Sequence, residues 1–221
     1  MYNIKEPYPK DLQLPIEKWH PKGNRQYGLQ RLLFVNQNAR FADVLYRRES
    51  RRSFHSVSEE NFGELLALTH SCKNKYINDN GFIVEQRNVI ASGALHAVHI
   101  LFNRPGDPSW HWYEPSTHSA IVLDISSEEL TTTARSFFDS APEATVIWYV
   151  ADIDYLEAKY DHPQSLLWRD AGAIQATHSL VCEHVGLSYC PLGIAGIEQA
   201  QLLSDERKLI GVGLAVVGDR M

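Results

Sequence analysis

The longest regular pattern of apolar and polar positions lies in residues 161–186. Asp161 and Pro163 are typical of a helix start, and Gly186 is typical of a helix end. Between them, apolar residues recur at spacings of three, four or seven, as one face of a helix requires. This stripe consists of Leu167, Ala171, Ile174, Val181 and Val185. We predict one long, half-buried helix here.

The rest of the chain shows a mixed pattern. A continuous apolar run at 144–150 predicts a central strand that is covered on both faces. Further strands are expected at 95–102, 110–113, 119–124 and 209–217. Helices are expected over the second half of 30–47, at 127–138 and at 197–203. Another helix is expected to begin at the capping-box pattern of residues 56–59 and to end at about residue 70. This order of elements predicts an α+β layout.

The first thirty residues differ from the remainder. They are rich in proline and show little periodicity, so we predict an extended N-terminal arm over residues 1–30 without a regular element. No repeat or low-complexity linker divides residues 31–221, which we predict to form a single domain. With 221 residues and 44% hydrophobic content, the chain can bury a substantial core.

Charge and cysteine content narrow the function classes. A net charge of -6 argues against binding to nucleic acid or to a bilayer surface, because both need clustered basic residues. Three cysteines are too few for a disulfide framework, and no basic-then-apolar leader begins the sequence. No apolar run approaches the roughly 20 residues that span a bilayer. We therefore expect a cytoplasmic protein without nucleic-acid or membrane partners.

Two short segments carry candidate chemistry. Arg51, Arg52 and Ser53 offer charge-assisted hydrogen bonds to a phosphate, just before a predicted helix. In isolation such a tripeptide is more often a solvated basic turn. The segment 190–193, Cys-Pro-Leu-Gly, predicts a rigid turn whose backbone can lie against a planar ligand. The ten histidines lack the spacing of metal ligands, so we predict no metal site.

Five motifs in order resemble the nitroreductase-like flavin enzymes over roughly residues 45–220. They are the Arg51–Ser53 tripeptide, residues 91–96, Tyr113-Glu114-Pro115 with His118, Asp170-Ala171-Gly172, and Gly186-Leu187 running into Pro191-Leu192-Gly193. The most similar branch is the SagB-type dehydrogenases, which include the azoline dehydrogenases of thiazole and oxazole biosynthesis. The resemblance implies an FMN-binding α+β fold with a central, mainly antiparallel sheet flanked by helices, and an intertwined homodimer.

The resemblance also implies a role for individual residues. Arg51, Arg52 and Ser53 would bind the phosphate and ribityl chain of FMN, and Arg220 would close the phosphate site. The flavin ring would lie between two groups. These are Ser92 and Gly93 from the other subunit and, along the opposite edge, Pro191, Leu192 and Gly193. Two positions depart from the family pattern, with His55 in place of a second basic residue and Ala91 in place of a proline.

Lys159 and Tyr160 indicate which branch of the nitroreductase-like family the chain resembles. In azoline dehydrogenases a similar Lys-Tyr pair precedes the long helix and is implicated in catalysis. Aromatising a thiazoline or oxazoline ring requires loss of a carbon-bound proton together with hydride transfer to flavin N5, so a base is needed beside the ring. The alternative is a surface lysine beside a packing tyrosine.

Three functions follow from this reading. The first is an FMN-dependent dehydrogenase that converts azoline rings to azoles in a peptide-derived natural product. Lys159 and Tyr160 would be the proton-abstracting pair, and oxygen would reoxidise the flavin. Other biosynthetic enzymes would be possible partners. The second is a nitro- or quinone-reducing enzyme that takes hydride from a nicotinamide, for which Lys159 would be dispensable. The third, based on His55 and Ala91, is a flavin-poor scaffold or partner subunit of a biosynthetic assembly.

Overall fold

A computed structural model describes residues 5–31, 39–125 and 128–221, and its centre is one seven-stranded sheet. All neighbouring strands of this sheet run antiparallel. In spatial order, they are β10 (Leu187–Leu192), β11 (Leu209–Asp219), β8 (Thr145–Asp152), β5 (Val98–Asn103), β6 (His111–Glu114), β7 (Ser119–Leu123) and β2 (Gly23–Gly28). The predicted α+β fold with a central antiparallel sheet is confirmed.

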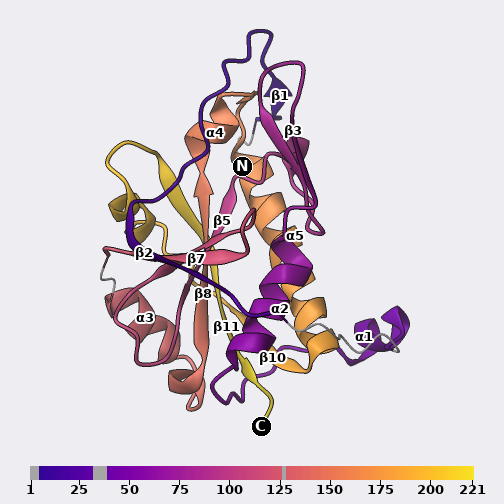
Figure 1. Ribbon diagram of the computed structural model, residues 1–221, viewed down its shortest axis with the longest axis vertical. Helices are drawn as coiled ribbons and strands as arrows, with labels where there is room; N and C mark the ends of the chain where they lie inside the picture. The colour runs from indigo at the N-terminus through magenta and orange to yellow at the C-terminus, as the bar shows by residue number, and fades with distance from the viewer. Residues whose placement is uncertain (1–4, 32–38, 126–127) are drawn as a thin grey trace.

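Helices cover both faces of the sheet. Figure 1 shows α2 (Glu59–His70) and α5 (Gln164–Val185) side by side on one side of the sheet and α3 (Glu128–Arg135) on the other. Two shorter helices are α1 (Phe41–Arg47) and α4 (Ile153–Glu157), and three short 3₁₀ segments are η1 (Ser92–Ala94), η2 (Ala141–Glu143) and η3 (Gln199–Leu203). Two small ribbons pair β1 (Tyr8–Pro9) with β9 (Tyr160–Asp161), and β3 (Asn74–Ile77) with β4 (Ile83–Gln86).

Strand β8 divides the core into two clusters. Ile147 and Tyr149 belong to the cluster under α2 and α5, whereas Val146 and Trp148 belong to the cluster that includes α3. This alternation follows from the period of two along a strand. Both faces of β8 therefore carry buried apolar side chains. This confirms the predicted strand with two covered faces.

Helix α5 has the predicted stripe and the predicted end. Leu167, Ala171 and Ile174 are buried, and Gly186 closes the helix in the left-handed conformation at φ 83°. The start differs in detail, because Asp161 does not cap the helix but pairs with Tyr8 in the β1–β9 ribbon. Pro163 occupies the cap position and makes no side-chain hydrogen bond there.

Three local expectations were wrong. Gly23–Gly28 form β2 at the edge of the main sheet, although we expected no regular element in residues 1–30. Residues 190–192 belong to the edge strand β10 and are not a turn. Helix α2 is capped by Ser58, whose side chain accepts a hydrogen bond from the Asn61 amide, so the capping box beginning at Ser56 does not form.

The remaining helix predictions are confirmed where the structure describes them. α1 ends at Arg47, α2 ends at His70, α3 covers most of the stretch predicted at 127–138, and η3 lies within 197–203. Residues 32–38, in the first half of the stretch 30–47, and Ser127 of the helix predicted at 127–138 lie outside the described residues. In the described ranges, no helix combines the length and the apolar character needed to cross a membrane.

Candidate functional site

The first group of candidate residues lies beside the N-terminal part of α5. The Ser92 backbone amide donates to both carboxylate oxygens of Asp170 at 2.9 and 3.1 Å, and the Ser92 hydroxyl donates to the same carboxylate at 2.9 Å. Burial raises the pKa of the Asp170 carboxyl, while the hydrogen bonds from Ser92 act in the opposite direction. These three bonds hold the segment η1 against α5.

Gly93 directly faces the Lys-Tyr pair. It adopts a left-handed conformation at φ 57°, which glycine tolerates better than residues with a side chain. A Cβ atom at this position would lie 2.5 Å from the Tyr160 hydroxyl oxygen and 2.7 Å from the Lys159 Nζ atom. The two polar atoms therefore point at the same spot, and only glycine leaves room for both of them.

The Lys-Tyr pair is held by the arm. Tyr160 pairs with Pro9 in the β1–β9 ribbon, and the Lys10 amide donates to the Lys159 carbonyl at 2.9 Å. The Lys159 Nζ atom lies 5.4 Å from the centroid of the Tyr160 ring and 5.8 Å from that of Phe82. Two aromatic rings thus lie within 6 Å of the Lys159 ammonium group.

The electrostatics of the pair suit proton transfer. Partial burial lowers the pKa of the Lys159 ammonium group, because the charged form loses hydration. Burial raises the pKa of the Tyr160 hydroxyl, and the Asp170 carboxylate raises it further. A lysine that deprotonates more easily stands next to a tyrosine that keeps its proton, which is an acceptor–donor combination.

The second group of candidate residues surrounds Glu183, near the C-terminal end of α5. Its side chain is only 4% exposed and receives three guanidinium groups. The Arg220 Nη2 atom lies 2.5 Å and the Arg51 Nη2 atom 3.3 Å from its Oε2 atom, and the Arg47 Nε atom lies 3.4 Å from its Oε1 atom. Arg51 also pairs with the exposed Glu49 at 2.7 Å. Positive charge therefore exceeds negative charge around Glu183.

A cavity of about 470 Å³ opens beside this cluster. Its lining is Glu49, Ser50, Arg51, Arg52, Ser53, Ser188, Arg220 and Met221. The Arg51 amide donates to the Tyr189 carbonyl at 3.1 Å, so the 51–53 segment runs alongside β10. Guanidinium groups and hydroxyls at one cavity wall are the donors that an organic phosphate requires.

Pro191, Leu192 and Gly193 extend along the same edge of the sheet. β10 is the outermost strand, and proline is accepted there because an edge strand can lack one amide donor. Pro191 and Gly193 are exposed, and a Cβ atom on Gly193 would meet nothing within 4 Å. The structure thus joins Arg51, Arg52, Ser53 and Arg220 with the edge that carries residues 191–193.

The two groups are separate within one chain. Asp170 and Glu183 are 13 positions apart on α5, which corresponds to about 20 Å along the helix. Figure 1 shows α5 running from the end of the molecule near α4 and β1 to the end near β10 and the C-terminus. Ser92, Gly93, Lys159 and Tyr160 lie at the first end, and the arginine cluster lies at the second.

Sequence reasoning missed Glu183 as a site residue and gave Asp170 no role. Glu183 pairs with Arg51 and Arg220, which are 132 and 37 positions away. Asp170 binds Ser92, which is 78 positions away. Both residues lie on the long predicted helix, but nothing in the helical period shows which distant segment reaches them. The motif Asp170-Ala171-Gly172 was the available signal for Asp170.

His178 on α5 has a structural role in the core. The His178 Nε2 atom lies 2.8 Å from the His70 Nε2 atom, and the His178 Nδ1 atom lies 2.8 Å from the Tyr149 hydroxyl. Burial lowers the pKa of His178 to about 3, so the ring is neutral at physiological pH. No group of three metal-ligating side chains forms among the residues described.

Comparison with known proteins identifies the fold. No family model and no curated protein matches the sequence. A Ralstonia eutropha protein described as a nitroreductase aligns over 95% of this chain and 98% of its own, with a TM-score of 0.70 and 16% identity. The Escherichia coli microcin synthetase McbBCD complex with truncated pro-MccB17 bound contains a chain that aligns with a TM-score of 0.60 and 14% identity, over 86% of this chain and 76% of that one.

A third solved structure is a Desulfovibrio desulfuricans protein in complex with FMN, also described as a nitroreductase. It aligns with a TM-score of 0.52 and 16% identity, over 82% of this chain and 87% of that one. These similarities show that the chain has the nitroreductase-like fold that the five motifs predicted.

Proposed function

We propose that this protein is an FMN-dependent oxidoreductase that dehydrogenates azoline rings to azoles in a peptide-derived natural product, as SagB-type dehydrogenases do. The observation that carries the proposal is the convergence of Lys159 and Tyr160 on Gly93. The fold supports it, because a protein of similar fold binds FMN and another belongs to a microcin synthetase complex. The latter also favours other biosynthetic enzymes as partners.

The chain's own residues fit FMN. A phosphate with a charge of nearly -2 suits the cavity, because Arg51, Arg52, Ser53 and Arg220 are among its lining residues. The exposed residues Pro191 and Gly193, with the half-buried Leu192 between them, offer an open edge for the flavin ring. Residues 1–30 act as an arm and 31–221 as the flavin-binding domain in this proposal.

The site is completed by a homodimer. About 20 Å along α5 separates Glu183 of the arginine cluster from Asp170, which binds Ser92, within one chain. We place the phosphate cavity of one subunit next to Ser92, Gly93, Lys159 and Tyr160 of the other subunit. The narrow space at Gly93 then faces the flavin ring, and the Lys-Tyr pair stands beside the substrate.

The residues divide the chemistry as follows. FMN, when bound, supplies the hydride acceptor. The neutral Lys159 amine would take a proton from a ring carbon of the azoline as a hydride departs from the ring. The substrate thus loses one proton and one hydride, which together are two hydrogens and two electrons, as the ring double bond forms. Partial burial favours the neutral amine. The Tyr160 hydroxyl stays protonated and donates a hydrogen bond that orients the substrate or the amine.

A nitro- or quinone reductase is the second candidate. It is favoured by the Ralstonia eutropha and Desulfovibrio desulfuricans structures, both described as nitroreductases. That reaction takes hydride from a nicotinamide and needs no base beside the ring, so Lys159 would be dispensable. The third candidate, a flavin-poor scaffold, requires that the purified protein take up no FMN.

The first experiment is an FMN titration followed by absorption spectroscopy. We expect the wild-type protein to show flavin bands, and Arg51→Ala to weaken FMN binding by at least about tenfold, because a charge-assisted contact to the phosphate is lost. Arg48→Ala is the matched control, since Arg48 is exposed and lines neither arginine-rich cavity. Absence of flavin at every FMN concentration would support the scaffold.

The second experiment separates the two enzymes. A peptide containing a thiazoline is incubated with the flavin-loaded protein, and formation of the thiazole is followed by the loss of two mass units. Lys159→Ala should slow this oxidation by about 10²–10⁴-fold. The alternative result is that the wild-type protein reduces nitroaromatic compounds or quinones with a nicotinamide, and that Lys159→Ala does so equally well. This result would identify the protein as a nitro- or quinone reductase.

A further inference from the structure

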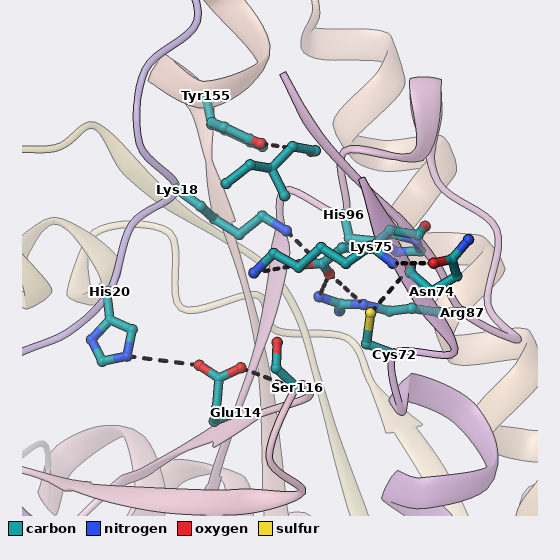
Figure 2. Close-up of polar contacts among 12 residues, drawn as sticks. Lys18, His20, Cys72, Asn74, Lys75, Arg87, His96, Glu114, Ser116 and Tyr155 are labelled. Atoms are coloured by element: carbon teal, nitrogen blue, oxygen red, sulfur yellow. Dashed lines mark hydrogen bonds and ion pairs between the residues drawn. The ribbon is translucent and has the colours of Figure 1, made fainter. Parts of the chain in front are cut away.

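A second cavity, of about 260 Å³, lies between the N-terminal arm and the main sheet. Its lining includes no residue of the arginine cluster and neither Lys159 nor Tyr160. One wall is formed by residues 17–20 of the arm. The other walls come from Lys75, Ile83 and Glu85 of the β3–β4 ribbon, from Arg87 just after it, from Val98, His99 and Ile100 of β5, and from residues 112–116 in and after β6. Figure 2 shows Lys18, Lys75 and Arg87 pointing toward one another above His20 and Glu114.

Two side chains in this cavity hold hydrogen-bond donors that have no acceptor among the described residues. The Lys18 Nζ atom is shielded from solvent and lies 3.4 Å from the Glu85 carboxylate. Glu85 can take at most one of the three ammonium hydrogens, so the others have no acceptor among the described residues. The Nδ1 atom of the buried His99 ring accepts a hydrogen bond from the Trp112 indole at 3.1 Å. The neutral ring therefore carries its proton on Nε2, which has no partner either.

Two carboxylates in the cavity, Glu85 and Glu114, are by contrast occupied. The Glu85 carboxylate binds the Arg87 guanidinium, with one contact of 2.9 Å to Nε, and lies 3.8 Å from the Lys75 Nζ atom. The Glu114 carboxylate accepts the Ser116 amide at 2.9 Å and lies 3.7 Å from the His20 ring. Buried donors without acceptors are rare in folded proteins, and a ligand that supplies an acceptor removes the penalty.

Much of the remaining lining is aromatic or aliphatic. Trp19, Trp112 and Tyr113 are almost fully buried, and Ile83 and Ile100 add aliphatic surface. A cavity of about 150 Å³ suffices for a benzene ring, so 260 Å³ leaves space for a ring that carries one small substituent. Aromatic walls favour a flat, apolar ligand body.

We infer that this cavity is a binding site for a small organic acid, in which the carboxylate lies between the Lys18 ammonium group and the His99 Nε2–H group and a ring-sized apolar body lies against Trp19 and Trp112. The carboxylate supplies two acceptor oxygens for the two donors. The Lys18 charge makes the site select an anion over a neutral molecule of the same shape. This inference does not depend on the proposed flavin chemistry.

A pair of probes tests the inference on the full-length wild-type protein. Benzoate and benzamide have nearly the same shape, but only benzoate is an anion. Calorimetric titration should show benzoate binding at least about tenfold more tightly than benzamide, since a charged hydrogen-bond partner contributes more than a neutral one. The inference is overturned if benzoate does not bind at millimolar concentration, or if benzamide binds equally well.

Variants locate the charge that selects the anion. Lys18→Met keeps the apolar stem of the side chain and should weaken benzoate binding by about tenfold while leaving benzamide binding unchanged. Lys22→Met is the matched control, because the Lys22 side chain is 94% exposed and lies outside this cavity. Thermal unfolding of each variant shows that it is folded. Equal benzoate affinity of a folded Lys18→Met and the wild type would contradict the site.

Discussion

At the scale of single residues, Gly93 decides whether Lys159 and Tyr160 can converge. Gly93→Ala places a Cβ atom within 2.7 Å of both polar groups at a positive φ, so we expect a loss of about 1–2 kcal/mol in the free energy of unfolding and a displaced Lys-Tyr pair. Urea unfolding and the azoline oxidation rate measure the two effects. Gly28→Ala is the control, since its Cβ atom meets nothing within 4 Å. If Gly93→Ala oxidises the azoline at the wild-type rate, the close approach of Lys159 and Tyr160 to Gly93 is not needed for the reaction.

Lys159 gives a pH dependence at the same scale. Burial lowers the pKa of its ammonium group below the usual 10.5, and only the neutral amine can accept a proton. The oxidation rate should therefore rise with pH and level off above that lowered pKa. Lys159→Met should remove the rising limb and slow oxidation by about 10²–10⁴-fold. The exposed Lys73, changed to Met, should leave the profile as in the wild type.

At the scale of elements, the β3–β4 ribbon depends on one carboxylate. Burial raises the pKa of Glu85, but Arg87, Lys18 and Lys75 outweigh it and hold the pKa at about 2. Because the folded-state pKa lies below the unfolded one, the stabilisation is complete above about pH 4.5 and is lost as the pH falls toward 2. Glu85→Gln should cost about 3 kcal/mol at pH 7, since it leaves buried cations unpaired.

Urea unfolding at two pH values checks the role of Glu85. The difference in unfolding free energy between the wild type and Glu85→Gln should be largest at pH 7 and should shrink at about pH 3. Glu60→Gln serves as the control, because Glu60 is exposed on α2. A difference that stays constant with pH would mean that the ion pairs of Glu85 do not stabilise the fold.

Helix α5 offers two glycines with opposite expectations. Gly186 ends the helix at φ 83°, so Gly186→Ala should destabilise the protein by about 1 kcal/mol. Gly172 lies inside the helix, where a Cβ atom would meet nothing within 4 Å, so Gly172→Ala should stabilise it by about 0.5–1 kcal/mol. Thermal unfolding of both variants gives the signs. Equal signs would contradict this assignment of the helix end.

Elements with a strong period were predictable, and elements held by distant pairing were not. α5 and β8 follow from their apolar patterns alone. β2 has no such pattern, because its residues 23–28 are largely polar and join the sheet through backbone pairing with β7 at an exposed edge. β10 was concealed by Pro191, which suggests a turn unless the strand is known to lie at the sheet edge.

The candidate site shows the same limit. The motifs named Ser92, Gly93, Lys159 and Tyr160 separately, but their meeting depends on Asp170 holding η1 against α5. The charge of the arginine cluster was visible in the sequence, whereas its carboxylate Glu183 was not. Contacts over 37 to 132 positions are determined by the packing of α5 on the sheet, and a local pattern carries no information about them.

At the scale of the whole molecule, the separation of the two groups along α5 makes the dimer testable. If each flavin site takes the arginine cluster from one subunit and the Lys-Tyr pair from the other, Arg51→Ala and Lys159→Ala damage different halves of it. In a symmetric dimer formed from one subunit of each variant, one site carries both defects and the other carries neither. If each site is instead built within one chain, every site of the mixed dimer carries one of the two defects.

Mixing the two variants therefore distinguishes these arrangements. Each variant alone should be nearly inactive in azoline oxidation at limiting FMN. After co-refolding in equal amounts, about half of the dimers are hybrids with one intact site of two, so about a quarter of the wild-type activity should return. Co-refolding either variant with itself is the control. No recovery, with hybrids demonstrated by mass spectrometry of tagged subunits, would assign the whole site to a single chain and refute the proposed interface.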